Sequence, residues 1–307
     1  VLFLIQGLEK MFFNHYFSKS PRPSFRTDRK RFYQGWLEFS ENKTALFSFY
    51  FLASFLIIAL FASWIAPYDP ADVNLSMRLE HPSAAHWFGT DEMGRDIFSR
   101  LVFGVRTTIL IVFLITFFTV PIGVFIGLVA GYASKSVDRF LMRVTDVFLA
   151  LPRLILALAF VGALGPGLIN LVIAISLTSW TFYARLVRSE TLLLRRENFV
   201  KAVKLQGANA FYILWHHILP LCIPSVIVRV SYDMAGVVLM AAGFGFLGLG
   251  VQPPLAEWGT MVASGQPYLL DHWWVSTVHG LTIFLTSLAL NFLGDGLRDV
   301  IDPRQSF

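Results

Sequence analysis

The sequence predicts an all-α, polytopic membrane protein with about six transmembrane helices. Hydrophobic residues make up 55% of its 307 residues, charged residues only 15%, and the mean hydropathy is +0.61. A soluble domain of this size carries about 25% charged residues. Six windows are long and apolar enough to span a hydrocarbon core, which needs about 20 residues each. The spans are expected near residues 45–66, 107–131, 145–164, 168–186, 222–246 and 275–294.

The chain divides into a basic N-terminal arm, residues 1–44, and a transmembrane domain, residues 45–307. The arm is rich in Lys, Arg and aromatic residues, which is typical of a segment that lies on anionic lipid. A specific partner for the arm is the alternative interpretation. The sequence leaves two starts open, Val1 and Met11, and the opening segment is too interrupted by polar residues to be a signal peptide.

Spans two and three contain features that predict packing and bending. Gly123, Gly127 and Gly131 lie four residues apart in span two, so small residues line one helix face and let another helix pack closely. Span three carries Leu151-Pro152-Arg153, where proline predicts a bend. Only Gly165-Pro166-Gly167 separates spans three and four.

Lys and Arg outside the spans fall mostly on one side of the membrane. They concentrate in the arm, in the loop after span two, in the segment 187–221 and in the C-terminal tail. Because cytoplasmic loops carry an excess of Lys and Arg, both termini and the segment 187–221 are expected in the cytoplasm. This asymmetry accounts for the net charge of +5, so no nucleic-acid partner is expected.

The sequence contains no recognisable catalytic or metal-binding motif. A Gly-x4-Gly-Lys-[Ser/Thr] phosphate loop is absent, so the chain is not expected to bind ATP itself. The single cysteine, Cys222, excludes a disulfide framework, and the seven histidines lack a persuasive ligand spacing. We expect no metal, no cofactor and no enzymatic activity in this chain. An intramembrane enzyme would need a nucleophile–base or metal pair, which the sequence does not suggest.

Two charged residues, Arg229 and Asp233, lie inside span five. An ionised group at the centre of a bilayer costs roughly 2.5–3.5 kcal/mol on insertion scales, so it should face a cavity or a partner. Their i, i+4 spacing places them on one helix face, where they could pair. Two interpretations stay open: the charges neutralise each other or bond to another helix, or they line a translocation path. His279 in span six is a weaker candidate for the path.

The segment 187–221 is longer and more polar than a return loop requires. It contains a basic, helix-favouring stretch from Asn198, which we expect Gly207 to break and Pro220 to stop. This arrangement is typical of a docking element for a soluble partner.

The predicted outer loop, residues 67–106, contains a compact glycine-rich motif. We expect a helix to begin over 95–100 and Thr90 or Asp91 to cap it. The motif reads Gly89-Thr90-Asp91, two residues, Gly94-Arg95-Asp96, two residues, Ser99-Arg100.

Together, four motifs resemble the dipeptide/oligopeptide/nickel branch of ABC importer permeases. They cover about residues 87–303. The motifs are the outer-loop phrase, the segment Lys201-Ala202-Val203 with Gly207 and Leu219-Pro220, the pieces Gln252-Pro253-Pro254 and Glu257-Trp258-Gly259, and the tail Gly294-Asp295-Gly296-Leu297-Arg298-Asp299 with Asp302-Pro303. The central family pattern begins Glu-Ala-Ala, so Lys201 stands where an acidic residue is usual.

The resemblance implies an ABC type I importer fold in the bacterial inner membrane. It implies that Lys201, Ala202, Val203, Gly207, Leu219 and Pro220 belong to a loop that couples the permease to ATPases. The implied partners are a second homologous permease, two cytoplasmic ATPase subunits that bind the ATP, and an external substrate-binding protein. Peptides are the implied substrates, with nickel or a metal chelate as the alternative. A stand-alone secondary transporter would need coupling-ion sites and usually an internal repeat, and no convincing repeat is present.

Overall fold

The computed structural model describes residues 35–301, so most of the predicted arm, both candidate starts and the end of the tail lie outside the described residues. Within this range the secondary structure is helical, apart from one isolated bridge between Thr90 and Asp96. The elements are α3 (Lys43–Ile65), η1 (Leu75–Met77), α4 (Ile97–Tyr132), α5 (Lys135–Leu149), α6 (Arg153–Leu164), α7 (Leu168–Leu194), α8 (Asn198–Leu205), α9 (Ala210–Ile213), the π-helical turn η2 (Leu214–Ile218), α10 (Leu219–Phe246), α11 (Trp258–Gly265), η3 (Gln266–Tyr268) and α12 (Trp274–Ile301).

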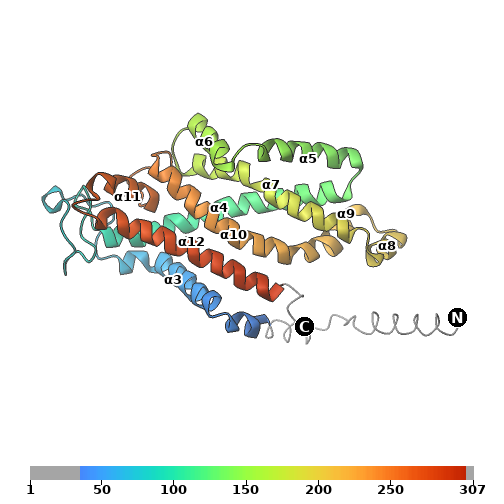
Figure 1. Cartoon of the computed structure of the whole chain (residues 1–307), viewed down its shortest axis with the longest axis horizontal. Helices are drawn as coiled ribbons and strands as arrows, with labels where there is room; N and C mark the ends of the chain where they lie inside the picture. The colour runs from blue at the N-terminus through green and yellow to red at the C-terminus, as the bar shows by residue number, and fades with distance from the viewer. Residues whose placement is uncertain (1–34, 302–307) are drawn as a thin grey trace.

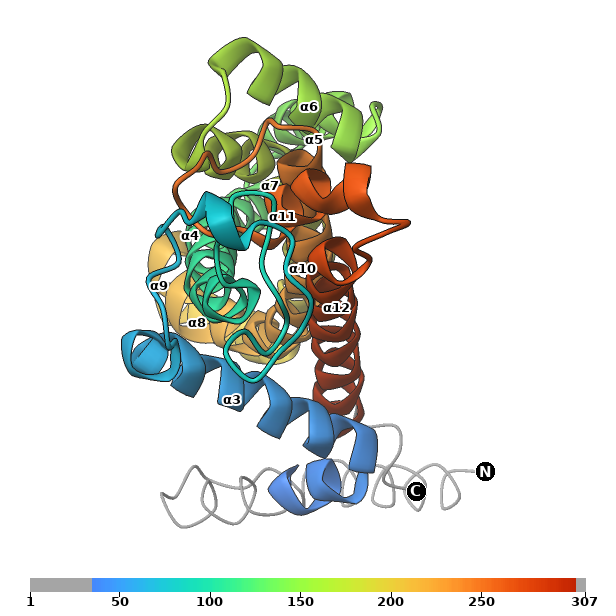
Figure 2. The ribbon, with the colours of Figure 1, turned by 90° about the vertical axis from the view of Figure 1, so that its left-hand side faces the viewer.

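Helices α4, α7, α10 and α12 form a bundle along the long axis of the molecule (Figure 1). One end, which we name the cap end, carries residues 66–96 and α11. The opposite end, which we name the loop end, carries α8 and α9. Figure 2, seen from the cap end, shows α3 crossing one side of the bundle next to α12.

Five described helices are long and apolar enough to cross a membrane, or six if the bent pair α5 and α6 is one span. The expected spans one, two, four, five and six correspond to α3, α4, α7, α10 and α12. The expected third span, 145–164, covers the end of α5 and all of α6, which meet at 84°. Pro152 lies at the break; in a continuous helix it would have no N–H to donate and its ring would clash with the preceding turn. The predicted bend at this proline is confirmed.

The glycine face of α4 packs directly on α7. A Cβ atom at Gly123 would lie 2.5 Å from the Trp180 carbonyl oxygen, and one at Gly127 would lie 2.7 Å from that of Ala184. These distances leave no room for a side chain, so the two backbones are in close contact. The small residues of span two therefore serve helix packing, as predicted.

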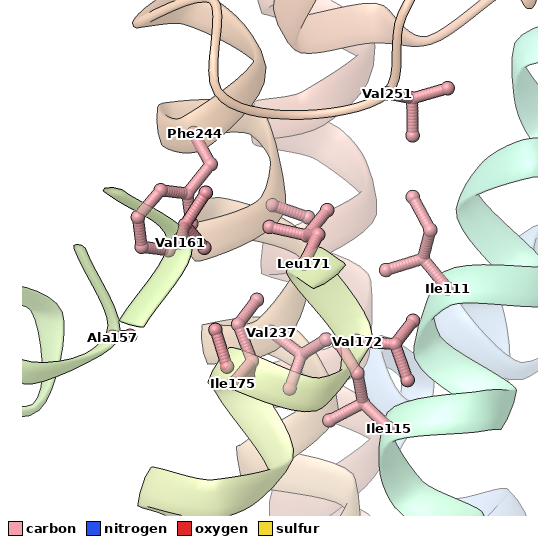
Figure 3. Packing of buried hydrophobic residues seen from close by; sticks show 12 residues of the cluster. Ile111, Ile115, Ala157, Val161, Leu171, Val172, Ile175, Val237, Phe244 and Val251 are labelled. Atoms are coloured by element: carbon pink, nitrogen blue, oxygen red, sulfur yellow. The ribbon is translucent and has the colours of Figure 1, made fainter. Parts of the chain in front are cut away.

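A cluster of buried apolar side chains joins α4, α6, α7 and α10 near the cap end (Figure 3). Ile111 of α4, Val172 of α7 and Phe244 of α10 contribute to it, and Val251 covers it from the loop after α10. Burial of this cluster holds α6 against the bundle although the chain breaks before it.

Asp96 caps α4, in place of the predicted Thr90 or Asp91. Its carboxylate accepts the Ser99 backbone N–H at 2.7 Å, so the helix begins at Ile97 rather than near Arg95. The difference arises because Asp91 is already engaged by Arg95, whose Nε donates to Asp91 Oδ2 at 2.7 Å.

Candidate functional site

A buried ion pair joins the break between α5 and α6 to the middle of α10. Arg153, the first residue of α6, donates from Nη1 to Asp233 Oδ1 at 2.8 Å. The Tyr183 hydroxyl donates to the other carboxylate oxygen at 3.2 Å, and Arg153 Nη2 donates to the Ser179 hydroxyl. Three elements, α6, α7 and α10, therefore meet at one carboxylate.

Asp233 does not pair with Arg229, so the expectation that these two charges neutralise each other is wrong. The Arg229 guanidinium lies over the Phe182 ring, 4.8 Å from its centroid. Helical side chains tilt toward the N-terminus, so a long Arg at position i points away from a short Asp at i+4. The alternative that Asp233 bonds to another helix is the one observed.

The cluster places two guanidinium groups against one aromatic ring and pairs one of them with an anion. Only 7% of the Asp233 side chain and 19% of the Arg153 side chain are exposed. Arg153 also lies 5.8 Å from the Phe182 centroid, so both guanidinium groups share this ring. Because burial removes water from the ion pair, the hydrogen bonds from Tyr183 and Arg153 replace the lost solvation. Such a cluster can offer both signs of charge to a zwitterionic solute.

His279 does not join this cluster. Its ring is buried on α12, its Nδ1 lies 2.8 Å from the Val275 carbonyl oxygen, and its nearby charges are Arg100 and Asp91 of the cap end. The geometry therefore gives His279 no shared role with Asp233.

The polar loop is shorter than expected because its neighbouring helices are longer. α7 continues to Leu194 and α10 begins at Leu219, so residues 195–218 connect them. Gly207 ends α8 with φ of +87°, a left-handed conformation that favours glycine. The predicted break at Gly207 is confirmed.

Pro220 does not stop a helix as expected. It lies in the first turn of α10, where the absent N–H is tolerated, and the π-helical turn η2 leads into it without a break. The wider π turn accommodates the proline ring because its hydrogen bonds skip one more residue.

α8 presents two different faces. Val200 is buried and Val203 packs beside it against the bundle, whereas Lys201 and Ala202 are exposed. Leu205 is 88% exposed, and beyond Gly207 the stacked rings of Phe211 and Trp215 also face outward. This apolar surface was missed in the sequence, although three large apolar residues in a polar loop are a usable signal of a protein contact.

Sequence reasoning also missed Arg153, Ser179, Phe182 and Tyr183. Arg153 carries a charge within an apolar window and follows a proline, which was an available signal. The other three lie in ordinary helix-forming sequence, and only the fold brings them to Asp233.

The cap end is held by buried charges. His86 Nδ1 lies 2.9 Å from Asp96 Oδ1, and Arg95 is bound to Asp91. Glu257 caps α11 by accepting the backbone N–H groups of Gly259 and Thr260 at 2.9 and 2.8 Å. Burial raises the pKa of Glu257, and these backbone hydrogen bonds oppose the rise.

Comparison with known protein families identifies the chain. Residues 123–307 match the family described as binding-protein-dependent transport system inner membrane component. The chain belongs to this family. Residues 31–82 match the N-terminal transmembrane domain of oligopeptide transport permease C. The chain is therefore a permease subunit of the binding-protein-dependent type and a multi-pass inner-membrane protein, as the motifs predicted.

Several relatives share about two fifths of its residues. The di/tripeptide transport system permease protein DppC of Pseudomonas aeruginosa (strain UCBPP-PA14) is 43% identical over 88% of this chain and 91% of its own. The probable D,D-dipeptide permease DdpC of Escherichia coli (strain K12) is 43% identical over 81% of this chain and 84% of its own. The nickel permease NikC of the same strain is 41% identical over 82% of this chain and 91% of its own.

A solved structure shares the fold. The inward-facing MetNI methionine ABC transporter aligns with a TM-score of 0.52 at 20% identity, covering 66% of this chain and 96% of that chain. This similarity confirms the expected fold of an ABC importer permease.

Proposed function

We propose that this chain is a permease subunit of an ATP-driven importer of di- and oligopeptides. The observation that carries the proposal is the 43% identity to a di/tripeptide permease over 88% of the chain. A zwitterionic solute also fits the chemistry of the buried cluster, in which Asp233 and two guanidinium groups lie close together.

The translocation path passes the Arg153–Asp233 pair. Backbone that leaves the helical conformation at membrane depth is tolerated only where protein buries it or where it lines a water-filled cavity. Residues Ala150, Leu151 and Pro152 at the break are exposed in the single chain. We therefore infer that the break faces the path, which a second permease closes, and that Asp233 and Arg153 belong to its lining.

The loop end binds an ATPase. Lys201, Ala202 and Val203 lie on α8, Gly207 sets the turn after it, and Leu219-Pro220 begin α10. The exposed Leu205 supplies an apolar contact on the same helix. Movement of the ATPases would push α8, and α10 would transmit that movement toward Asp233. ATP is bound and hydrolysed by the partner chains.

The orientation follows from charge. Lys and Arg concentrate at the loop end and in the arm, so both termini are assigned to the cytoplasm. The cap end then faces outward, where a substrate-binding protein would deliver the solute.

Nickel or a metal chelate is the second candidate substrate, because the nickel permease NikC is 41% identical over 82% of this chain. Uptake measured in cells that lack this gene separates the two substrates. Restoration of labelled dipeptide uptake by the wild-type gene, without a change in nickel accumulation, is expected. Restoration of nickel accumulation alone would overturn the peptide assignment.

A further inference from the structure

A pocket of about 440 Å³ opens between α7, α10 and α12, one to two turns nearer the loop end than Asp233. Arg229 and Tyr232 of α10 and Arg298 of α12 supply its polar lining, together with Ser225. Leu186 and Val228 contribute to its apolar lining. The pocket is therefore amphipathic and contains two guanidinium groups.

The pocket lies at the depth of the lipid headgroups. α12 has 28 residues and is about 42 Å long at 1.5 Å per residue, whereas the hydrocarbon core is about 30 Å thick. The helix begins at Trp274 in the cap end, so Arg298, in its last turn, lies at the opposite membrane surface. The Arg229 side chain tilts toward the N-terminus of α10, which brings its guanidinium toward the same surface.

Neither guanidinium has an ion-pair partner among residues 35–301. The Nε atom of Arg229 is buried without a hydrogen-bond acceptor in that range. No acid is among the residues that line the pocket; Asp295 accepts the Tyr232 hydroxyl at 2.6 Å, and Asp299 accepts the Asn42 side-chain amide at 3.3 Å. The two arginines therefore leave positive charge beside an apolar surface.

We propose that this pocket binds the phosphate group of an anionic phospholipid. Arginine matches phosphate oxygens with charge-assisted hydrogen bonds, and basic pockets between transmembrane helices suit acidic headgroups. Leu186 and Val228 would contact the glycerol and upper acyl chain. A substrate carboxylate offers similar charge, but it lacks the acyl chains that the apolar lining of the pocket would contact.

Native mass spectrometry of the full-length chain tests the site. The delipidated protein is titrated with phosphatidylglycerol or phosphatidylcholine of identical acyl chains. Phosphatidylglycerol is expected to bind more tightly. One basic residue near a membrane surface contributes about fivefold in affinity, so Arg298→Gln should weaken phosphatidylglycerol binding about fivefold and Arg229→Gln with Arg298→Gln about 30-fold. Arg298→Lys should retain most of the affinity.

The matched control is Arg139→Gln with Arg143→Gln, which removes the same charge from the exposed face of α5. This control should bind phosphatidylglycerol as the wild type does. Equal affinity for both lipids, or an equal loss in the control, would overturn the proposal. Competition experiments distinguish the lipid from other anions. Displacement of phosphatidylglycerol by a dipeptide would overturn the proposal and assign the pocket to the substrate. Displacement by millimolar inorganic phosphate would overturn it in favour of a site for free anions. If the double variant does not fold, the comparison of Arg298→Gln with Arg298→Lys tests the proposal: equal phosphatidylglycerol affinity of these two variants would overturn it.

Discussion

Arg153 Nη1 lies 2.8 Å from Asp233 Oδ1, so the first residue of α6 is tied to the middle of α10. The two residues are 80 positions apart, and their contact fixes the break in the broken span against the bundle. An isolated buried charge is costly in this environment, whereas a hydrogen-bonded pair is tolerated. The ion pair therefore serves packing, whatever further role the substrate gives it.

Removal of one partner of this pair should destabilise the protein. Arg153→Met leaves Asp233 buried without its cation. We expect the free energy of unfolding to fall by about 2–3 kcal/mol. This is at or below the low end of the loss usual for a broken buried ion pair, because Arg153 is partly exposed. Arg153→Met with Asp233→Leu should recover most of this loss. Thermal unfolding in detergent measures both.

The control for the pair is Arg185→Gln with Asp146→Asn, which removes an exposed ion pair between α7 and α5. It should change stability by less than about 1 kcal/mol. A double variant of the buried pair that is less stable than Arg153→Met alone would contradict the paired-charge interpretation.

The glycine face of α4 should not tolerate a methyl group. At Gly127 a Cβ atom would lie 2.7 Å from the Ala184 carbonyl oxygen, so Gly127→Ala must push α4 away from α7. We expect a loss of about 1–3 kcal/mol, as for other overpacked sites. At Gly162 of α6 no atom lies within 4 Å of the added carbon, so Gly162→Ala is the control. Equal yields and unfolding midpoints for the two variants would refute the close contact.

Gly207 should matter through its backbone rather than its surroundings. An added Cβ meets nothing within 4 Å, but φ of +87° strains a β-branched residue by about 1–3 kcal/mol. Gly207→Val should insert and assemble normally yet reduce the stimulation of the partner ATPase by loaded binding protein. Gly207→Asn, which adopts left-handed conformations more readily, should retain more stimulation. Wild-type stimulation and uptake in Gly207→Val would show that the turn only connects α8 and α9.

Glu257 should give the cap end a pH dependence. Burial raises its pKa above the ordinary value of 4.5, so the folded protein holds this proton more tightly than the unfolded chain does. The contribution of protonated Glu257 to the free energy of unfolding is therefore complete below pH 4.5. It falls as the pH rises through the higher pKa of the folded state. Unfolding midpoints measured between pH 4.5 and 7.5 should depend less steeply on pH in Glu257→Gln than in the wild type. The same pH dependence of the unfolding midpoint in both proteins would contradict a raised pKa of Glu257.

The sequence predicted the helical class and five of the spans because long apolar windows have few other solutions in a membrane. It predicted the packing role of Gly123, Gly127 and Gly131 because small residues at a spacing of four line one helix face and let another helix approach closely. The bend at Pro152 was also predicted, but not its size, which depends on how the apolar cluster holds α6.

The partner of Asp233 could not be found from helical periodicity. That periodicity suggested Arg229, four residues away, whereas the true partner comes from another helix. The same limit applies to the cap of α4, where Asp96 and Asp91 are both suitable in sequence. Only the fold, which engages Asp91 with Arg95, decides between them.

Dipeptide uptake by the variant Arg153→Met with Asp233→Leu tests the central claim most directly, because it separates packing from transport. The variant is reconstituted with its partner chains, and samples with wild-type assembly and unfolding midpoint are compared. If Asp233 and Arg153 line the path, uptake should fall at least about tenfold, equivalent to about 1.4 kcal/mol in the transport barrier. Wild-type uptake by this well-assembled variant would contradict the account.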